Sequence, residues 1–109
     1  MREPWQPATE DIELAQVMHA LADPVRLEIV ARLARTPGLA CTAAASGIDL
    51  HKSTMSHHYQ VLREAGVTLT RLDGRTRLVE LRRDDLDARF PGLLDAVLTA
   101  LAHRTAARA

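Results

Sequence analysis

The chain has one cysteine, few aromatic residues and no long apolar run. With Cys41 alone, no intramolecular disulfide can form, and a reducing cytoplasm is the expected location. One Trp, one Tyr and one Phe leave a core of aliphatic side chains. No segment approaches the roughly 18–20 consecutive apolar residues of a membrane span, and no apolar run follows Arg2, Glu3 and Pro4 as in a signal peptide. We expect one domain with no membrane contact.

The formal net charge is zero, but the charges are unevenly distributed. From Lys52 to Arg83 there are seven basic and three acidic residues, whereas residues 1–29 contain two basic and six acidic residues. A zero net charge argues weakly against a nucleic-acid partner. The segregation matters more, and it predicts that the second half of the chain is the part that would touch DNA.

Residues 52–67 predict one short helix with two different faces. Apolar or bulky residues recur at three- and four-residue spacing, as on an inward-facing stripe: Met55, His58 or Tyr59, Leu62 and Ala65. Short or planar hydrogen-bonding residues lie mostly off that stripe: Ser53, Thr54, Ser56, His57, Gln60 and Arg63. A helix that enters the DNA major groove needs such side chains in its first half. Ser53 is expected to cap this helix, and Gly66 to end it.

A basic β-hairpin is predicted directly after this helix. Residues 67–72 are strand-like, Asp73-Gly74 is a two-residue type I′ turn signal, and residues 75–81 form the returning strand. A recognition-type helix followed by such a ribbon indicates a winged helix-turn-helix. Three arginines gather near one tip, where phosphates or a minor groove are within reach: Arg71, Arg75 and Arg77.

The rest of the chain predicts a mainly α fold of about five helices plus this two-stranded wing. Residues 1–8 are expected to form an extended arm, and Thr9 to cap a first helix. Asp23-Pro24 begins a second helix with a capping carboxylate and a proline at the first helical position. Thr36-Pro37-Gly38 ends it. Residues 41–46 form a short helix of small residues.

The end of the chain carries more apolar helix than one small domain needs. Asp84-Asp85 is expected to cap a last helix, which Pro91-Gly92 kinks or restarts. Packing on the first helix or on a second copy would bury its apolar seam. We expect a homodimer through the first and last helices, which would present two recognition helices roughly 34–36 Å apart to an inverted repeat. The predicted interface residues are Leu14, Val17, Leu94, Val97, Leu98 and Leu101. The predicted domain is 9–103, followed by a tail at 104–109.

With these segments laid out, the chain resembles the ArsR/SmtB family of bacterial winged-helix regulators over residues 10–102. The resemblance rests on residues 19–30, residues 53–66 and the Asp73-Gly74-Arg75 wing. It implies a homodimeric repressor of a palindromic operator, released by an effector that is often a metal ion. It also implies a role for each DNA-facing residue: the groove for Ser53, Thr54, Ser56, His57 and Gln60, the DNA backbone for Lys52 and Arg63, and the wing for Arg75 and Arg77.

Neither metal site that the resemblance implies is complete in this sequence. A Cys-x-Cys cluster would need a partner near Cys41, which is followed by Thr42 and Ala43. One thiolate alone is a poor soft-metal site. An Asp and His site on the last helix would fall mostly on apolar positions, with His103 near its end. Cys41 and His103 are therefore only weak candidates for a nickel or zinc site. Adjacent His57 and His58 point about 100° apart and cannot easily chelate one ion.

The favoured function is a sequence-specific DNA-binding transcriptional regulator, a homodimeric repressor controlled by an unidentified effector. One alternative is a nickel or zinc sensor with His and carboxylate ligands at the dimer interface. Another is a winged-helix protein-interaction module that requires a partner protein. An enzyme is not expected, because Ser56-His57 is accompanied by no third orienting group, glycine elbow or oxyanion loop.

Overall fold

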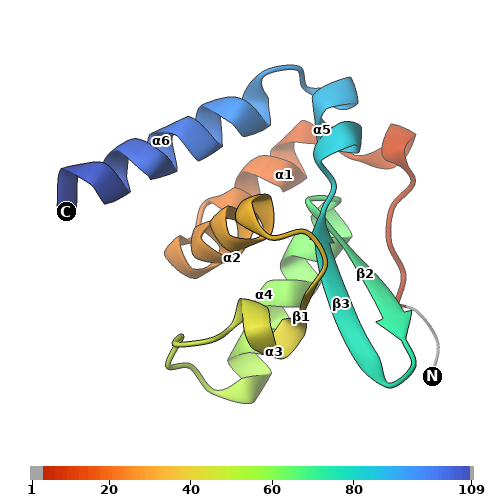
Figure 1. Ribbon diagram of the computed structural model, residues 1–109. Helices are drawn as coiled ribbons and strands as arrows, with labels where there is room; N and C mark the ends of the chain where they lie inside the picture. The colour runs from red at the N-terminus through yellow and green to blue at the C-terminus, as the bar shows by residue number, and fades with distance from the viewer. Residues whose placement is uncertain (1–3, 109) are drawn as a thin grey trace.

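The computed structural model describes residues 4–108, with side chains as far as Arg104. The helices pack beside a small antiparallel sheet, and the two longer strands of that sheet form a hairpin that projects from one side (Figure 1). The elements in chain order are η1 (Thr9–Asp11), α1 (Leu14–Leu21), α2 (Pro24–Arg35), β1 (Leu39–Ala40), α3 (Cys41–Ala44), α4 (Lys52–Ala65), β2 (Thr68–Asp73), β3 (Thr76–Leu81), α5 (Arg83–Arg89) and α6 (Leu93–Arg108). This is the predicted winged helix-turn-helix. None of the described helices is long and apolar enough to cross a bilayer.

The first helix begins later than the sequence predicts. Residues Thr9–Asp11 form only a 3₁₀ turn, and α1 starts at Leu14 after an extended Ile12. Thr9 caps no helix; its hydroxyl donates instead to Asp85 Oδ1 at 2.7 Å. The Ile12 side chain is 1% exposed and packs against Gly66. These contacts between distant parts of the chain explain why local helix signals fail here.

The second helix begins as predicted. The Asp23 carboxylate accepts hydrogen bonds from the backbone N–H groups of Val25 and Arg26, at 2.8 and 3.1 Å, and Pro24 occupies the first helical position. These bonds satisfy two of the donors that a helix N-terminus leaves unpaired. The helix ends at Arg35, immediately before the predicted Thr36-Pro37-Gly38 stop.

The hairpin is predicted correctly except for its turn, and a third strand is added. Asp73 pairs with Thr76, so the turn residues are Gly74 and Arg75 rather than Asp73 and Gly74. Among the described residues, positive φ occurs only at glycines, including Gly74, which fits a type II′ turn rather than type I′. The two-residue strand β1 pairs with β3 on the side opposite β2. A strand that short leaves no alternating pattern to detect.

The N-terminal arm is fastened to the open edge of β2. The Gln6 side-chain amide accepts from the Thr70 backbone N–H at 2.6 Å and donates to the Thr70 carbonyl at 3.0 Å. One side chain thus takes the place of a neighbouring strand at this point. Residues 1–3 of the predicted arm lie outside the described residues. No local pattern predicts this contact, because it depends on a single glutamine in the arm.

Helix α4 has one incorrect and one correct boundary prediction. Its N-terminal cap is His51, whose Nδ1 accepts from the backbone N–H of Ser53 at 3.2 Å, so Ser53 is not the cap. At the other end Gly66 has φ of 85°, and Val67 N–H donates to the Leu62 carbonyl in a Schellman motif. A Cβ at Gly66 would also lie 2.5 Å from Ile12 Cγ1. Glycine is therefore required here by both backbone and space.

The last helical segment restarts at Pro91-Gly92 as predicted. Asp84 and Asp85 lie inside the first turn of α5 rather than capping it, since α5 begins at Arg83. Helix α6 continues to Arg108, so the predicted 104–109 tail is helical through residue 108, and residue 109 lies outside the described residues.

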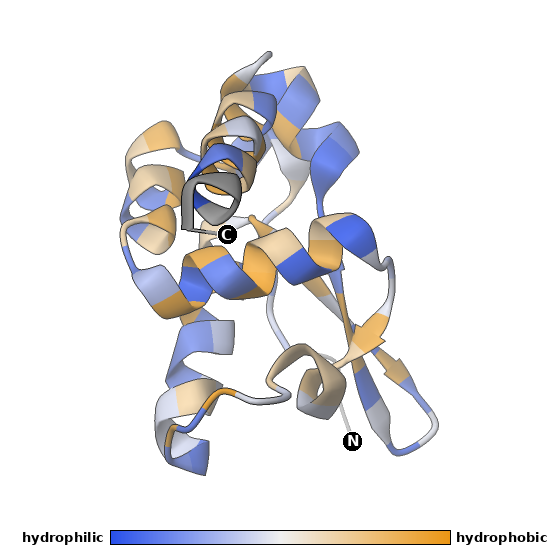
Figure 2. Cartoon of the chain, turned by 60° about the vertical axis from the view of Figure 1, so that its left-hand side comes forward, coloured by the Kyte–Doolittle hydropathy of each residue, from blue (hydrophilic) through white to orange (hydrophobic). Residues whose placement is uncertain are grey.

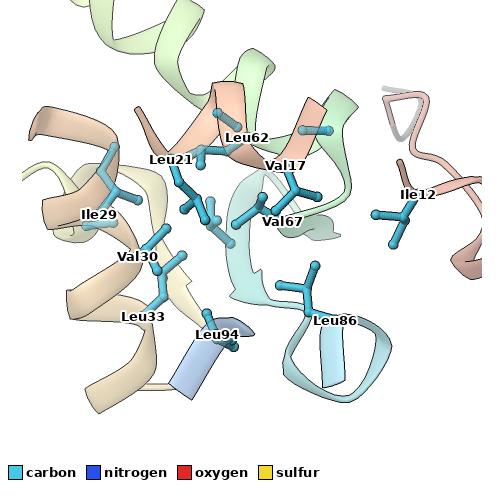
Figure 3. Close-up of a cluster of buried hydrophobic side chains, with 14 of the residues drawn as sticks. Ile12, Val17, Leu21, Ile29, Val30, Leu33, Leu62, Val67, Leu86 and Leu94 are labelled. Carbon is cyan, nitrogen blue, oxygen red and sulfur yellow. The ribbon is translucent and has the colours of Figure 1, made fainter. Parts of the chain in front are cut away.

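One aliphatic core joins all the long helices to the sheet (Figure 3). Its largest fully buried side chains come from η1–α1, α2, α4, the start of β2, β3 and α6: Ile12, Val17, Ile29, Val30, Leu33, Leu62, Val67, Val79 and Leu94. Val17, Leu94 and Leu101, three of the predicted dimer residues, are buried within the single chain. Val17 and Leu94 therefore belong to the core of the single chain. Of the other three, Leu14 is 49% exposed, and Val97 and Leu98 are half-buried.

Candidate nucleic-acid interface

Helix α4 has an inner and an outer face, as the sequence predicts. The inner face is buried: Met55, His58, Leu62 and Ala65. The outer face is exposed and polar: Lys52, Ser53, Thr54, Ser56, His57 and Gln60. The Gln60 amide nitrogen donates to Glu64 Oε2 at 3.2 Å, one helical turn further on. The outer face thus presents hydroxyl, imidazole and amide groups together, which are the groups that read base edges.

A buried hydrogen-bond network fixes the position of α4. Arg26 is 8% exposed; its Nε donates to the Ala20 carbonyl at 2.7 Å and its Nη1 to His58 Nδ1 at 3.1 Å. A guanidinium can only donate, so His58 Nδ1 is the acceptor and the ring proton is on Nε2. The network ties the end of α1 and the start of α2 to the middle of α4. Sequence periodicity placed His58 on the inner stripe but did not identify its partner.

Asp23 completes this network and remains charged. Burial raises the pKa of Asp23. The backbone N–H groups of Arg26 and Val25 and the charge of Arg26 lower it by more than burial raises it, so the net pKa is below the ordinary 3.8. The carboxylate lies 4.0 Å from both Arg26 Nη1 and His58 Nδ1. It therefore acts as helix cap and counter-charge together.

The three wing arginines lie in three different environments. Arg71 is on the outer side of the hairpin and forms an ion pair with Glu80. Arg77 lies opposite Leu72, and strand alternation puts it on the same face as the buried Thr70 and Val79. Arg75 is in the turn, exposed, and none of the ion pairs among the described residues includes it. The outer half of the hairpin is hydrophilic (Figure 2).

Several other arginines of the basic segment bind the protein's own backbone or carboxylates. Arg63 Nε donates to the Trp5 carbonyl at 3.3 Å, and Arg82 donates to the Pro7 carbonyl at 2.7 Å and to Asp85. Arg83 pairs with Asp95. A count of charges along the sequence therefore overstates the positive charge that is available to an outside partner.

The weak metal candidates, Cys41 and His103, have no cluster of ligands around them among the described residues of the single chain. Burial raises the pKa of the Cys41 thiol, although Arg77 and Arg63 partly oppose this, so the thiol is protonated at neutral pH. A thiol that stays protonated is a poor metal ligand. His103 is exposed on α6. Within the part of the chain that the structure describes, no three His, Cys, Asp or Glu residues are grouped to hold a metal ion.

Comparison with known proteins identifies the family. A helix-turn-helix domain family model matches residues 21–71. The chain is 38% identical over 90 residues to an uncharacterized HTH-type transcriptional regulator of Bacillus subtilis (strain 168), YceK, covering 82% of this chain and 90% of the relative. A solved structure of "a possible ArsR-family transcriptional regulator" is 30% identical to the chain and covers 83% of it. The chain belongs to the ArsR family of winged helix-turn-helix transcriptional regulators. Members of this family are DNA-binding regulators and not enzymes.

Solved structures of ArsR-type regulators share the fold. The homodimeric winged helix-turn-helix DNA-binding domain of "a possible ArsR-family transcriptional regulator" from Mycobacterium bovis is 30% identical, with a TM-score of 0.64, covering 83% of this chain and 82% of that one. The transcriptional repressor BigR from Xylella fastidiosa is 26% identical, with a TM-score of 0.62, covering 86% of this chain and 96% of that one. The predicted family and fold are confirmed.

Proposed function

We propose that this ArsR-family regulator acts in the cytoplasm as a homodimeric repressor that binds an inverted-repeat operator through the outer face of α4. The observation that carries the proposal is the separation of the two faces of that helix. Its polar face is exposed along the first half of the helix, while the buried face and the Arg26 network hold it in a fixed position. A rigid, exposed polar helix face is what major-groove reading requires.

In this proposal the wing supplies phosphate contacts mainly through its tip. Arg75 is exposed and in the turn, so its charge is available to a phosphate or a minor groove. Arg71 already shares its charge with Glu80, whereas Arg77 is exposed but projects from the face of the hairpin that carries Thr70 and Val79. Lys52, at the first position of α4, adds a second exposed cation beside the groove-facing residues.

The dimer is proposed through α1 and α6. Leu14 and Met18 are one helical turn apart on α1 and are 49% and 52% exposed, so the single chain leaves about half of this apolar pair uncovered. On α6, Val97 and Leu98 are half-buried and keep part of their apolar surface. The solved Mycobacterium bovis relative is a homodimer, and BigR is a repressor, which supports both parts of the proposal.

The test is fluorescence anisotropy of the purified protein with its own promoter region, over a salt series and with excess random duplex. Tight binding that resists the competitor supports a specific regulator, and repression is then tested with a promoter–reporter fusion. Binding that is only weak and falls steeply with salt would contradict specific recognition. Sedimentation of Leu14→Glu and Met18→Glu, with Leu50→Glu as an exposed control, tests the dimer: only the first two should yield monomers.

A further inference from the structure

A cavity of about 490 Å³ lies behind the recognition helix. Residues from four places line it: α3, the turn after it, α4 and the inner face of the hairpin. Its apolar wall includes Ala45, Ile48 and Met55, and Cys41 adds a protonated thiol. A volume of this order is typical of small-molecule sites.

The charged residues that line this cavity are all positive. Lys52, Arg63 and Arg77 line it, and among the described lining residues none is acidic. Lys52 and Arg77 take part in none of the ion pairs between described residues, unlike Arg71, Arg82 and Arg83, whereas Arg63 donates to the Trp5 carbonyl. Unpaired cations beside a half-enclosed apolar wall favour a ligand that carries the missing negative charge.

Tyr59 adds neither a free hydroxyl donor nor a negative charge to the cavity. The Tyr59 hydroxyl already donates to the Cys41 carbonyl at 2.6 Å, and the Thr70 backbone is engaged by Gln6. Burial, and then the nearby Cys41, raise the pKa of Tyr59 to about 12, so the phenol adds no negative charge. The cavity therefore offers apolar contact and positive charge, with the hydroxyl groups of Thr42, Ser56 and Thr70 as its other polar side-chain groups.

We propose that this cavity binds a small organic anion with an apolar body, a carboxylate on an acyl or aryl chain, and that this anion is the effector. Lys52 and Ser56 line the cavity and also belong to the proposed DNA-reading face of α4. A carboxylate that binds Lys52 removes a phosphate contact, and an occupied cavity changes the surface offered to the groove. The effector role rests on the proposed function, whereas ligand binding does not.

Binding is tested without DNA, because the single thiol of the chain reports on the cavity. Cys41 lines it, so an occupant should slow alkylation of Cys41 by iodoacetamide, with free glutathione in the same solution as the reagent control. The probes are decanoate and 2-naphthoate, and decanol is the uncharged match for decanoate. We expect both anions to protect Cys41 and decanol to protect it at least about fivefold more weakly. No protection by either anion up to its solubility limit, or equal protection by decanol, overturns the proposal.

Two variants locate the site. Arg77→Gln should weaken decanoate binding at least about fivefold in calorimetry, whereas Arg104→Gln, an exposed arginine on α6, should leave it unchanged. Ala45→Phe adds volume inside the cavity without altering charge and should abolish binding, with unfolding curves confirming that the variant is folded. Unchanged decanoate affinity in both Arg77→Gln and folded Ala45→Phe would place the anion elsewhere and overturn the proposal.

The effector role is measured separately, by adding decanoate or 2-naphthoate to the protein–operator complex. An effector in this cavity should lower operator affinity at least about fivefold. Binding to the cavity with unchanged operator affinity would overturn the effector role and leave the ligand site intact. Absence of any specific DNA binding, with Cys41 still protected, would mean that the proposed function fails while the ligand site remains.

Discussion

The two faces of α4 differ in what fixes their side chains. On the inner face, Leu62 is fully buried and His58 receives a hydrogen bond from Arg26. On the outer face, Ser56, His57 and Gln60 are exposed, and Gln60 has only an exposed bond to Glu64. The inner face thus determines where the helix lies, and the outer face is left to be determined by a partner. Substitutions on the two faces should therefore affect different measurements.

Leu62→Ala should produce the largest loss of stability. The side chain is 0% exposed in the core, so truncation should lower the free energy of unfolding by about 2–5 kcal/mol. Leu50→Ala, at a residue that is 39% exposed, is the control and should cost less than about 1 kcal/mol. Urea unfolding measures both. Equal losses would mean that the inner face does not hold the helix.

Arg26→Met should have the second-largest effect, and it should lower both the stability of the protein and its affinity for the operator. It leaves the Ala20 carbonyl and His58 Nδ1 without their donor, which should lower the free energy of unfolding by about 1–3 kcal/mol. Because His58 then loses its anchor, operator affinity should fall even at temperatures where the protein is folded. Arg35→Met, an exposed arginine at the end of the same helix, should change neither. Unaltered affinity in folded Arg26→Met would show that the network is not needed to position α4.

His57→Ala, unlike Leu62→Ala, should weaken operator binding and leave the stability of the protein almost unchanged. The side chain is exposed, so unfolding should change by no more than about 0.5 kcal/mol. Operator binding should weaken by about 1–3 kcal/mol if the imidazole contacts a base edge. His103→Ala, an exposed histidine on α6, is the matched control for anisotropy titrations. Equal affinities for the two variants would remove His57 from the proposed interface.

Asp23→Ala should cost about 1 kcal/mol of stability through loss of the N-cap. Its pH dependence gives a sharper check. Since the folded pKa of Asp23 is below 3.8, the wild-type advantage should be complete above the ordinary pKa range and should disappear as the pH falls through 3.8 and then through the lowered pKa. Urea unfolding of both proteins across this range measures it. An advantage that persisted at the lowest pH would show that the charge of Asp23 is not its source.

Arg75→Gln should have the smallest effect on DNA affinity, and that effect should not depend on the DNA sequence. Loss of one phosphate contact should weaken specific and random DNA alike and reduce the salt slope by about 1. Arg71→Gln should reduce it less, because Glu80 already neutralises much of that charge. Salt titrations of the two variants compare a free with a paired arginine. A larger effect from Arg71→Gln would contradict the proposal that Arg75 supplies the main phosphate contact of the wing.

Local patterns were sufficient to predict the start of α2, and to predict α4 and the hairpin apart from the N-cap of α4 and the turn of the hairpin. The spacing of Leu62 and Ala65, the Asp23-Pro24 pair and the glycine at 66 act within a few residues, so their effects are readable in sequence. The start of α1 could not be predicted from local patterns, because Ile12 packs against Gly66 and Thr9 donates a hydrogen bond to Asp85, both far along the chain. Contacts of that range leave no local pattern.

The predicted site and interface were limited by the same lack of long-range information. Periodicity showed that Val17 and Leu94 belong to apolar faces, but not that their own chain covers them. Likewise the charge of Arg63 and Arg82 was evident, but not that each donates to a backbone carbonyl of the arm. The partner of a side chain is a property of the folded chain.

The most direct test of the account is an operator scan with Gln60→Ala. Each base pair of the operator is changed in turn, and binding is measured for the wild type and the variant, with folding confirmed by urea unfolding. If the outer face of α4 reads bases, the variant should lose discrimination at one position, or at its symmetry mate, and keep it elsewhere. Unchanged discrimination at every position would contradict the assignment of that face to the major groove.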